Sequence, residues 1–501
     1  MTSLLDDHQD IATQTHPNSV SLIQNLVKSS GIYALASLAS PLVALLLTPF
    51  LTHHLSHSTY GALAVLNTVI TLVAGVTELG LHSAFLRAYT YDYETERDRA
   101  HVLSTVVILL SLTSIPVVIV GSIAAPQLSV LLVNSSSFSD SIRLAAFVIL
   151  LQNLTIPGFW WLRAENRAAF SSILSLLNLF ATAVVTIVLV GVLHMDIVGA
   201  LIATGAGYAV VVICTMPIIL RHAGLRLRFD IAWKLLTFGV PNVINLLSGW
   251  VLQLSDRYLL GHLGSLSQTA SYAVAYSLGG IASSIIIAPF SLAWWSVIYS
   301  IAKKDGAPRA FQLIFRWFSI VLLFATFGLS LFGISVLDIF FPPAYHSAAP
   351  VIPIIALSTM FSGTYLIVSL GLSLQRKTWL AAIFFTCSAL LNVGINIILI
   401  PPYGAMGAAM ATLVAYAALA LMGYIANQRI YPVPFEIGLF TIALLAGTAL
   451  YTGSDFLARA QTTYVVWSIH IGAFVLYSGC LLLLGKLPAW KLYKRQSEET
   501  S

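Results

Sequence analysis

The chain has 501 residues, of which 58% are hydrophobic and only 9% are charged. An average soluble domain is about 25% charged, so this composition excludes an ordinary soluble protein and indicates one that lies mostly within a membrane. The net charge of +5 does not indicate nucleic acid as a partner, because the basic residues fall in short loops between apolar segments. The three cysteines, Cys214, Cys387 and Cys480, all lie in apolar runs, which excludes a disulfide framework.

Apolar segments recur along nearly the whole chain. The first 20 residues are polar and acidic and lack the pattern of a cleaved signal peptide, so the first apolar segment is expected to direct insertion. Each segment is long enough to cross a hydrocarbon core of ~30 Å, which takes roughly 20 residues. We predict about 14 transmembrane helices, at residues 29–52, 59–83, 101–124, 143–162, 168–193, 197–220, 235–260, 269–297, 310–333, 350–373, 378–400, 403–427, 433–454 and 463–485.

The positions of lysine and arginine predict the orientation of these helices. Loops on the cytoplasmic side of a membrane carry an excess of basic residues. With 14 helices, 21 of the 24 lysines and arginines fall on one side, Arg143 and Arg459 fall on the other, and Arg257 lies within a helix. Both termini are therefore expected in the cytoplasm of a cell whose cytoplasmic membrane holds this multi-pass protein.

The sequence also repeats itself after roughly 208 residues, the length of six predicted helices. Leu176-Leu-Asn178 followed by Gly199-Ala-Leu-Ile-Ala-Thr204 recurs as Leu390-Leu-Asn392 followed by Gly407-Ala-Ala-Met-Ala-Thr412. Because six is even, the two halves share one orientation, as in transporters built from parallel repeats. Packing chemistry shared by chance remains the alternative for any single match, since small residues are common between membrane helices.

The predicted fold is therefore an all-α polytopic membrane protein with two parallel six-helix repeats around a central cavity. The expected organisation is a cytoplasmic tail (1–28), an N-terminal six-helix bundle (29–228), a C-terminal six-helix bundle (229–430), two extra transmembrane helices (431–487) and a basic cytoplasmic tail (488–501).

Short motifs at the starts of the two halves resemble those of a known family. They are Gly31-Ile-Tyr-Ala-Leu, Leu47-Thr-Pro-Phe-Leu-Thr52, Tyr60-Gly-Ala-Leu-Ala, Glu78-Leu-Gly-Leu81, Ala84-Phe-Leu-Arg87, Phe238-Gly-Val-Pro241, Asp256-Arg-Tyr-Leu-Leu-Gly261 and Ser271-Tyr-Ala-Val-Ala275. They resemble the polysaccharide flippases of the multidrug/oligosaccharidyl-lipid/polysaccharide exporter superfamily. Family members often carry a basic residue in the first helix, where this chain has Ala36, Ser37 and Ser40.

The resemblance implies a flippase that moves a polyprenyl-diphosphate-linked oligosaccharide across the cytoplasmic membrane for cell-surface polysaccharide biosynthesis. The expected mechanism is alternating access coupled to H⁺ or Na⁺, with membrane lipids and polysaccharide-assembly enzymes as further partners. No cofactor is expected, and the sequence contains no spacing of residues that is typical of a catalytic or metal site.

Ionisable residues within predicted membrane helices are candidates for transport, since each costs at least ~2.5–3.5 kcal/mol to insert. Glu78 is a candidate for ion coupling, with hydration at the interface or pairing with Arg87 as alternatives. Arg87, Arg163 and Arg167 could meet a diphosphate, although the excess of cytoplasmic basic residues also explains them. Asp256 is the second coupling candidate, and Asp256 and Arg257 are alternatively a pair at the membrane interface, where long side chains extend to the head groups.

The seventh predicted helix carries a polar stripe. At ~100° per residue, five of its residues lie within roughly 80° of one another and Arg257 borders them. We predict that the stripe lines the substrate cavity, whereas hydrogen bonds between helices are the alternative. The five residues are Asn242, Asn245, Gly249, Gln253 and Asp256. Gly239 and Pro241 would permit a bend near the start of this helix.

Two other functions compete with the flippase. A cation-coupled multidrug antiporter of the same superfamily would need carboxylates deep in the first half, where Glu78 stands alone. A membrane-embedded glycosyltransferase or polymerase would need acidic or basic groups in sizeable outer loops, where 125–142 offers only Asp140 and 334–349 offers Asp338 and His346. The sequence therefore predicts a transporter rather than an enzyme.

Overall fold

The computed structural model describes residues 43, 45–165, 167–302, 306–458 and 463–486, and the elements within these ranges are helices joined by short loops. The α-helices are α2 (His57–Thr77), α3 (Leu81–Arg87), α4 (Glu96–Ile123), α5 (Ala125–Val133), α6 (Ser139–Ala164), α7 (Ala168–Thr186), α8 (Asp196–Ala223), α9 (Phe229–Leu263), α10 (Leu266–Gly279), α11 (Ala288–Ala302), α12 (Ala307–Phe340), α13 (Ile352–Val368), α14 (Leu370–Leu374), α15 (Thr378–Tyr403), α16 (Ala405–Ile430), α17 (Ile437–Ala458) and α18 (Thr463–Lys486). Shorter π and 3₁₀ turns include η4 (Ser283–Ile287) and η5 (Pro343–Val351).

The membrane helices predicted from hydropathy are confirmed where the structure describes them. Twelve helical stretches in the described ranges are long and apolar enough to cross a membrane, and they coincide with the predicted helices 2 to 6 and 8 to 14. The first predicted helix lies largely outside the described residues. The seventh, 235–260, lies within α9.

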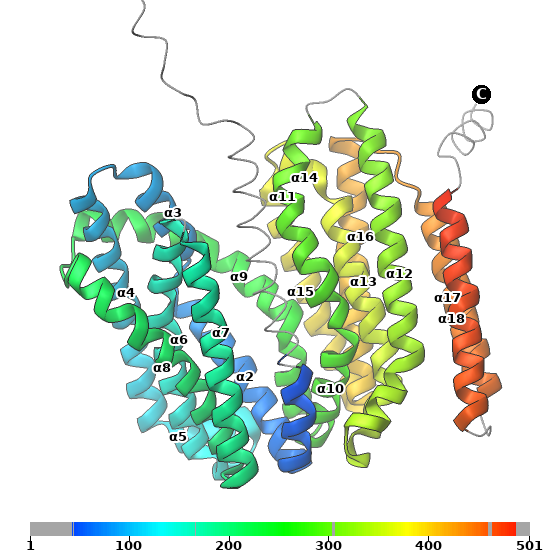
Figure 1. Ribbon diagram of the computed structural model, residues 1–501, viewed down its shortest axis with the longest axis horizontal. Helices are drawn as coiled ribbons and strands as arrows, with labels where there is room; N and C mark the ends of the chain where they lie inside the picture. Colours follow the sequence, from blue (N-terminus) through cyan, green and yellow to red (C-terminus); the bar gives the residue numbers. More distant parts are fainter. Residues whose placement is uncertain (1–42, 44, 166, 303–305, 459–462, 487–501) are drawn as a thin grey trace, which may run out of the picture.

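The helices form two bundles joined by α9, with α17 and α18 at one side (Figure 1). Neighbours repeat between the bundles: α8 packs against both α6 and α7, and α16 packs in the same way against α13 and α15. These are the helices that carry the repeated Leu-Leu-Asn and Gly-Ala motifs. The pairing follows from the motifs, because small residues let helix backbones approach closely within a membrane.

The two bundles meet through α2 and α10, which lie side by side at the lower end of Figure 1. One apolar core there includes Leu66 of α2, Ile149 of α6, Tyr272 of α10 and Ile352 of α13, and so unites both bundles. A Cβ atom added at Gly61 would overlap the carbonyl oxygen of Leu266, so only glycine permits this approach. We call this the α2–α10 end of the molecule.

The opposite end of the molecule carries most of the arginines, and we call it the basic end. It includes the α3–α4, α6–α7 and α8–α9 connections, with Arg97, Arg163, Arg167 and Arg228. Here the bundles have separate apolar cores: one contains Phe85, Trp160 and Leu235, and the other contains Trp294 and Phe311. Among the described residues, one apolar core is shared by both bundles, and it lies at the α2–α10 end.

Helix α9 belongs to both bundles. Its 35 residues span about 52 Å at 1.5 Å per residue, far more than a hydrocarbon core of ~30 Å. Its first half packs against α3 and its second half against α15 and α16. Figure 1 shows it running from the N-terminal bundle at the basic end to α10 at the α2–α10 end.

A buried ion pair fastens the last two helices. Arg316 of α12 donates through Nε to Oε2 of Glu436 at 2.5 Å, and Gln312 Nε2 donates to Oε1 of the same carboxylate at 2.8 Å. Only 7% of the Arg316 side chain and 9% of the Glu436 side chain are exposed. Because Glu436 directly precedes α17, this pair fixes the start of α17 against α12.

Replacing only one partner of this pair should cost stability. We expect Arg316→Met to lower the free energy of unfolding by about 3–5 kcal/mol, because it leaves a buried carboxylate unpaired. Thermal denaturation of the purified protein in detergent measures the loss. The double variant Arg316→Met/Glu436→Met should recover most of it, and a single variant as stable as the unmodified chain would contradict the role of the pair.

Candidate functional site

Asp256 lies completely buried on α9, at the junction with α10 and α16. Its Oδ2 accepts hydrogen bonds from the Tyr272 hydroxyl and, at 2.7 Å, from the Thr412 hydroxyl. Its Oδ1 is also buried and has no hydrogen-bond partner among the described residues. The alternative that Asp256 forms an interfacial pair with Arg257 is therefore wrong for this carboxylate, which lies inside the protein.

Two asparagines of α15 extend this buried polar group. Asn396 Nδ2 donates to Oδ1 of Asn392 at 3.0 Å, and Asn392 Nδ2 donates to the Thr412 hydroxyl at 3.4 Å. Both asparagines are fully buried, and within the described chain Asn396 Oδ1 has no partner. We call Asp256, Tyr272, Asn392, Asn396 and Thr412 the Asp256 cluster.

The Asp256 cluster has an excess of acceptors. A buried oxygen without a partner costs about 1–3 kcal/mol, and a buried carboxylate costs more unless a proton or a cation neutralises it. Two such oxygens, Asp256 Oδ1 and Asn396 Oδ1, belong to this one cluster. The arrangement can therefore take up a proton or a small cation that prefers oxygen ligands.

Arg257 lies beside the cluster without an ion pair to any described residue. Its guanidinium lies 4.4 Å from the centre of the Tyr276 ring, and its Nη1 donates to the Gln253 carbonyl at 3.4 Å. The geometry is a cation–π contact, which Arg favours because its guanidinium is planar. Its remaining donors are available to an anion.

A cavity of about 300 Å³ lies next to this arginine, at the small end of the ~300–1,000 Å³ typical of ligand pockets. It is bordered by Leu45 and Thr48 near the start of the described chain and by α9, α10, η4, α13 and α16, and Gln253 and Tyr276 are in its wall. Of the polar stripe of α9, Gln253 lines this cavity, whereas Asp256 lies buried among the helices. Gly249 faces open space, and the side chains of Asn242 and Asn245 lie outside the described residues.

Glu78 lies at a break in the second predicted helix. Helix α2 ends at Thr77, and Leu79 (φ 53°) and Gly80 (φ 64°) adopt left-handed conformations before α3 begins. The break meets α9, because a Cβ atom added at Gly239 would lie 2.6 Å from the Leu79 carbonyl oxygen. Among the described residues Glu78 forms no ion pair, so the expected alternative of pairing with Arg87 is wrong.

Arg87 belongs to the basic end instead. It forms an ion pair with Asp92 at 3.6 Å, and its guanidinium lies 5.0 Å from the centre of the Phe238 ring on α9. Arg167 lies over the Trp161 ring at 5.8 Å, and Arg163 is exposed. Glu78 and Arg87 are thus both near the first half of α9, whereas the Asp256 cluster and Arg257 belong to its second half.

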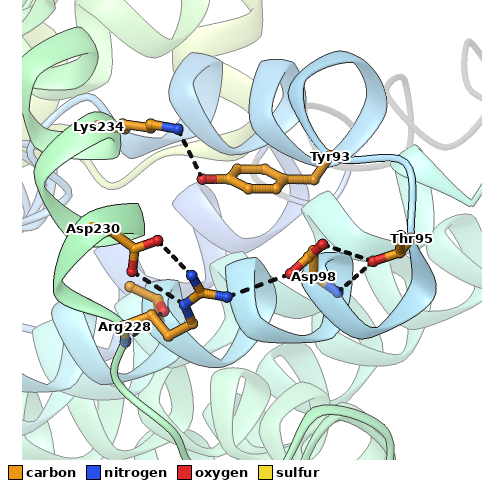
Figure 2. Close-up of polar contacts among 7 residues, drawn as sticks. Tyr93, Thr95, Asp98, Arg228, Asp230 and Lys234 are labelled. Carbon is orange, nitrogen blue, oxygen red and sulfur yellow. Dashed lines mark hydrogen bonds and ion pairs between the residues drawn. The ribbon is translucent and has the colours of Figure 1, made fainter.

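Polar contacts fasten the start of α9 to the N-terminal bundle, as Figure 2 shows. Arg228 pairs with Asp230 at 2.6 Å and with Asp98 of α4 at 3.4 Å, and Lys234 donates to the Tyr93 hydroxyl at 3.4 Å. The Arg228 guanidinium lowers the pKa of the exposed Asp230 below its ordinary value of 3.8. Because the carboxylate accepts a proton only below that value, the pair stays formed throughout the physiological pH range.

Of the five residues in the cluster, Asp256 is the one that the sequence singled out as functional. Tyr272, which belongs to the motif Ser271-Tyr-Ala-Val-Ala275, is fully buried. Thr412 was noted only as part of the repeated Gly-Ala motif. The repeat did carry a signal, because Asn392 and Thr412 end its two motifs in the C-terminal half and meet in one cluster.

Comparisons with known proteins agree on the fold. The family model described as "Polysaccharide biosynthesis protein" matches residues 26–300, more than half of the chain. No curated protein matches the chain. Among solved structures, a lipid II flippase MurJ in an inward closed conformation is 15% identical, with a TM-score of 0.70 over 92% of this chain and 98% of that one.

Multidrug transporters of the MATE family share the fold as well. An inward-facing MATE transporter of the MOP superfamily is 15% identical, with a TM-score of 0.65 over 79% of this chain and 97% of its own. The MATE multidrug transporter DinF-BH, solved as a complex, is 14% identical, with a TM-score of 0.59 over 83% of this chain and 97% of its own. At these identities the likeness concerns the fold alone.

Proposed function

The chain belongs to the polysaccharide biosynthesis protein family, and from this premise we propose that it is a flippase for polyprenyl-diphosphate-linked oligosaccharides. It moves them across the cytoplasmic membrane by alternating access and supplies cell-surface polysaccharide biosynthesis. The observation that carries the proposal is the unpaired Arg257 next to an uncharged polar cavity. Arginine donors match the geometry of a diphosphate, and the uncharged cavity beside it suits the rest of a neutral head group.

The proposed orientation places the basic end in the cytoplasm, together with both termini. Its support is the excess of arginines and lysines at that end. The α2–α10 end then faces outward, and it is the end at which the bundles share one apolar core. Substrate enters from the basic end, where Arg87 is a candidate for the first contact with the diphosphate.

Asp256 is the residue that we propose for ion coupling. A coupling group must bind its cation with different affinity in the two states of the transporter. Asp256 has an unpartnered buried oxygen, and its helix spans both bundles. A relative movement of the bundles would change what surrounds this carboxylate. Glu78 is the second candidate, because it lies at the helix break on which α9 rests.

The multidrug antiporter remains the competing function, since MATE transporters share the fold. A cationic drug would be favoured by a carboxylate in the wall of its site. The described residues that border the cavity include no Asp or Glu, and this supports a substrate whose bound part is neutral. An embedded glycosyltransferase or polymerase is a weaker alternative, because Asp338 and His346 are the only ionisable pair of the 334–349 loop and both are about half exposed.

A flipping assay tests the proposal. The purified protein is placed in liposomes with a fluorescent polyprenyl-diphosphate oligosaccharide, and a membrane-impermeant quencher reports the label in the outer leaflet. We expect redistribution that responds to an imposed H⁺ or Na⁺ gradient and that falls strongly in Arg257→Ala and Glu78→Gln.

Arg143→Ala serves as the matched control, because Arg143 is exposed and pairs only with the exposed Asp140 at 2.6 Å. This variant should flip the substrate like the unmodified chain. Redistribution no faster than in empty liposomes, together with movement of cationic dyes by the same preparation, would overturn the flippase in favour of the antiporter.

A further inference from the structure

The wall of the cavity is unusually rich in hydroxyl groups. Of the 13 described residues that line it, eight are Ser, Thr or Tyr, one more is Gln253, and none is charged. Four of them, Ser283, Ser284, Thr359 and Ser362, form no side-chain hydrogen bond within the described chain. Thr359 is buried and Ser284 and Ser362 are half-buried. Polar groups inside a protein are normally hydrogen-bonded, so a set left free around one cavity indicates a ligand with donors and acceptors of its own.

Two tyrosines supply a different kind of surface to the same cavity. Tyr276 of α10 and Tyr416 of α16 both line it, and their side chains lie within hydrogen-bonding reach of each other. An aromatic ring offers a broad apolar face with a polar hydroxyl at one end. Rings of this kind, set among free hydroxyls, suit a ligand that has apolar C–H faces and hydroxyl edges, which is the chemistry of a sugar ring.

The position of Arg257 orients that ligand. Its guanidinium lies over the Tyr276 ring at 4.4 Å. A positively charged group with free hydrogen-bond donors therefore lies next to the cavity wall that suits a sugar. In a polyprenyl-diphosphate glycan the diphosphate is attached directly to the first sugar. We propose that the cavity binds the first one or two sugar rings of the glycan while Arg257 holds the adjoining diphosphate. This assignment rests on the proposed flippase function.

The proposed sugar site is one helical turn from the Asp256 cluster along two helices. Tyr276 follows Tyr272 by four residues on α10, and Tyr416 follows Thr412 by four residues on α16, so each pair shares a helix face. Tyr272 and Thr412 donate to Asp256, and the Tyr272 and Tyr276 rings lie 6.0 Å apart. A sugar in the cavity and a cation at the Asp256 cluster would therefore contact neighbouring residues on the same faces of α10 and α16.

Protection of an introduced cysteine tests the sugar site directly. In the full chain, Cys214, Cys387 and Cys480 are replaced by Ala and Ser362→Cys or Ser284→Cys is added. Alkylation by N-ethylmaleimide is then measured with undecaprenyl-diphosphate oligosaccharide extracted from the native membrane, or with undecaprenyl diphosphate that lacks sugar. A variant that retains only Cys387, which is exposed on α15 and absent from the cavity wall, is the matched control.

We expect the glycolipid to slow alkylation at both cavity cysteines at least fivefold, the sugar-free lipid to slow it less than twofold, and Cys387 to react equally with either. Tyr416→Phe should raise the concentration needed for half protection about fivefold, because it removes one hydrogen-bonding hydroxyl. Equal protection by both lipids would overturn the sugar site, since the cavity would then hold the diphosphate end.

Absence of protection in a protein that still flips the glycolipid would also overturn the sugar site, while leaving the flippase function in place. The reverse result, protection by the glycolipid in a protein that does not flip it, would leave the sugar site standing and refute the flippase. The two proposals therefore fail in different ways.

Discussion

Asp256→Asn should abolish the response of flipping to an ion gradient while leaving the protein folded. Asparagine has the same shape, and its Oδ1 can accept the hydrogen bonds that Tyr272 and Thr412 donate to Asp256. It has no negative charge to attract a cation and no carboxylate to take up a proton. The gradient-driven rate should fall about 5–150-fold, the range that corresponds to a coupling free energy of 1–3 kcal/mol.

The quencher assay, run with and without a gradient, measures this effect. Asp140→Asn is the matched control, because Asp140 is 81% exposed and pairs only with Arg143. That variant should keep the full gradient response. If Asp256→Asn responded to the gradient like the unmodified chain, Asp256 would not be the coupling residue, and Glu78 would remain as the candidate.

Gly61→Ala should destabilise the state in which α2 and α10 are in close contact. The added Cβ atom would overlap the backbone carbonyl of Leu266, which cannot swing aside as a side chain can. Relief requires α2 and α10 to separate, and overpacking costs about 1–3 kcal/mol. A cost of that size shifts the equilibrium between the two states about 5–150-fold. Flipping should fall accordingly, because the closed α2–α10 end is one of the two states that transport requires.

Accessibility of Ser271→Cys to an impermeant maleimide separates this shift from simple unfolding. Ser271 is buried at the α2–α10 contact, where its hydroxyl hydrogen-bonds to His57 at 3.1 Å and to Ser347 at 2.7 Å. Labelling from outside should rise in Gly61→Ala while the melting temperature stays within a few degrees. Gly394→Ala, at a helical glycine with open space around it, should change neither. Unchanged labelling and flipping in Gly61→Ala would contradict a tight closure.

The membrane fold could be predicted because the bilayer leaves few alternatives. Every backbone polar group in lipid must be satisfied within the protein, so long apolar runs must become helices. Twelve of the predicted helices coincide with helices of the structure for this reason. The hydropathy of a membrane helix is a property of about 20 residues together, so its prediction does not depend on which residue packs against any one of them.

Single positions depend on neighbours far away in the chain, and there the sequence was less informative. The burial of Asp256 follows from Thr412, which lies 156 residues further on, and no helical periodicity shows which face of α16 will meet α9. The break at Glu78 was also missed, because left-handed Leu79 has no sequence signature and Gly80 alone is common in membrane helices. Gln253 lines a cavity in the structure, and its place in a polar stripe is a pattern that a single helix can show without its neighbours.

The long sequence separation within the Asp256 cluster also sets an order of events during synthesis. Tyr272 emerges from the ribosome 16 residues after Asp256, whereas Thr412 emerges 156 residues after it. At about 5–20 residues per second, Thr412 arrives about 8–30 s after Asp256. The residues that fasten the start of α9 in the structure, Arg228 and Lys234 with their partners Asp98 and Tyr93, all emerge before Thr412. The first half of the nascent chain thus supplies the anchor of a charged helix before its last partner has been made.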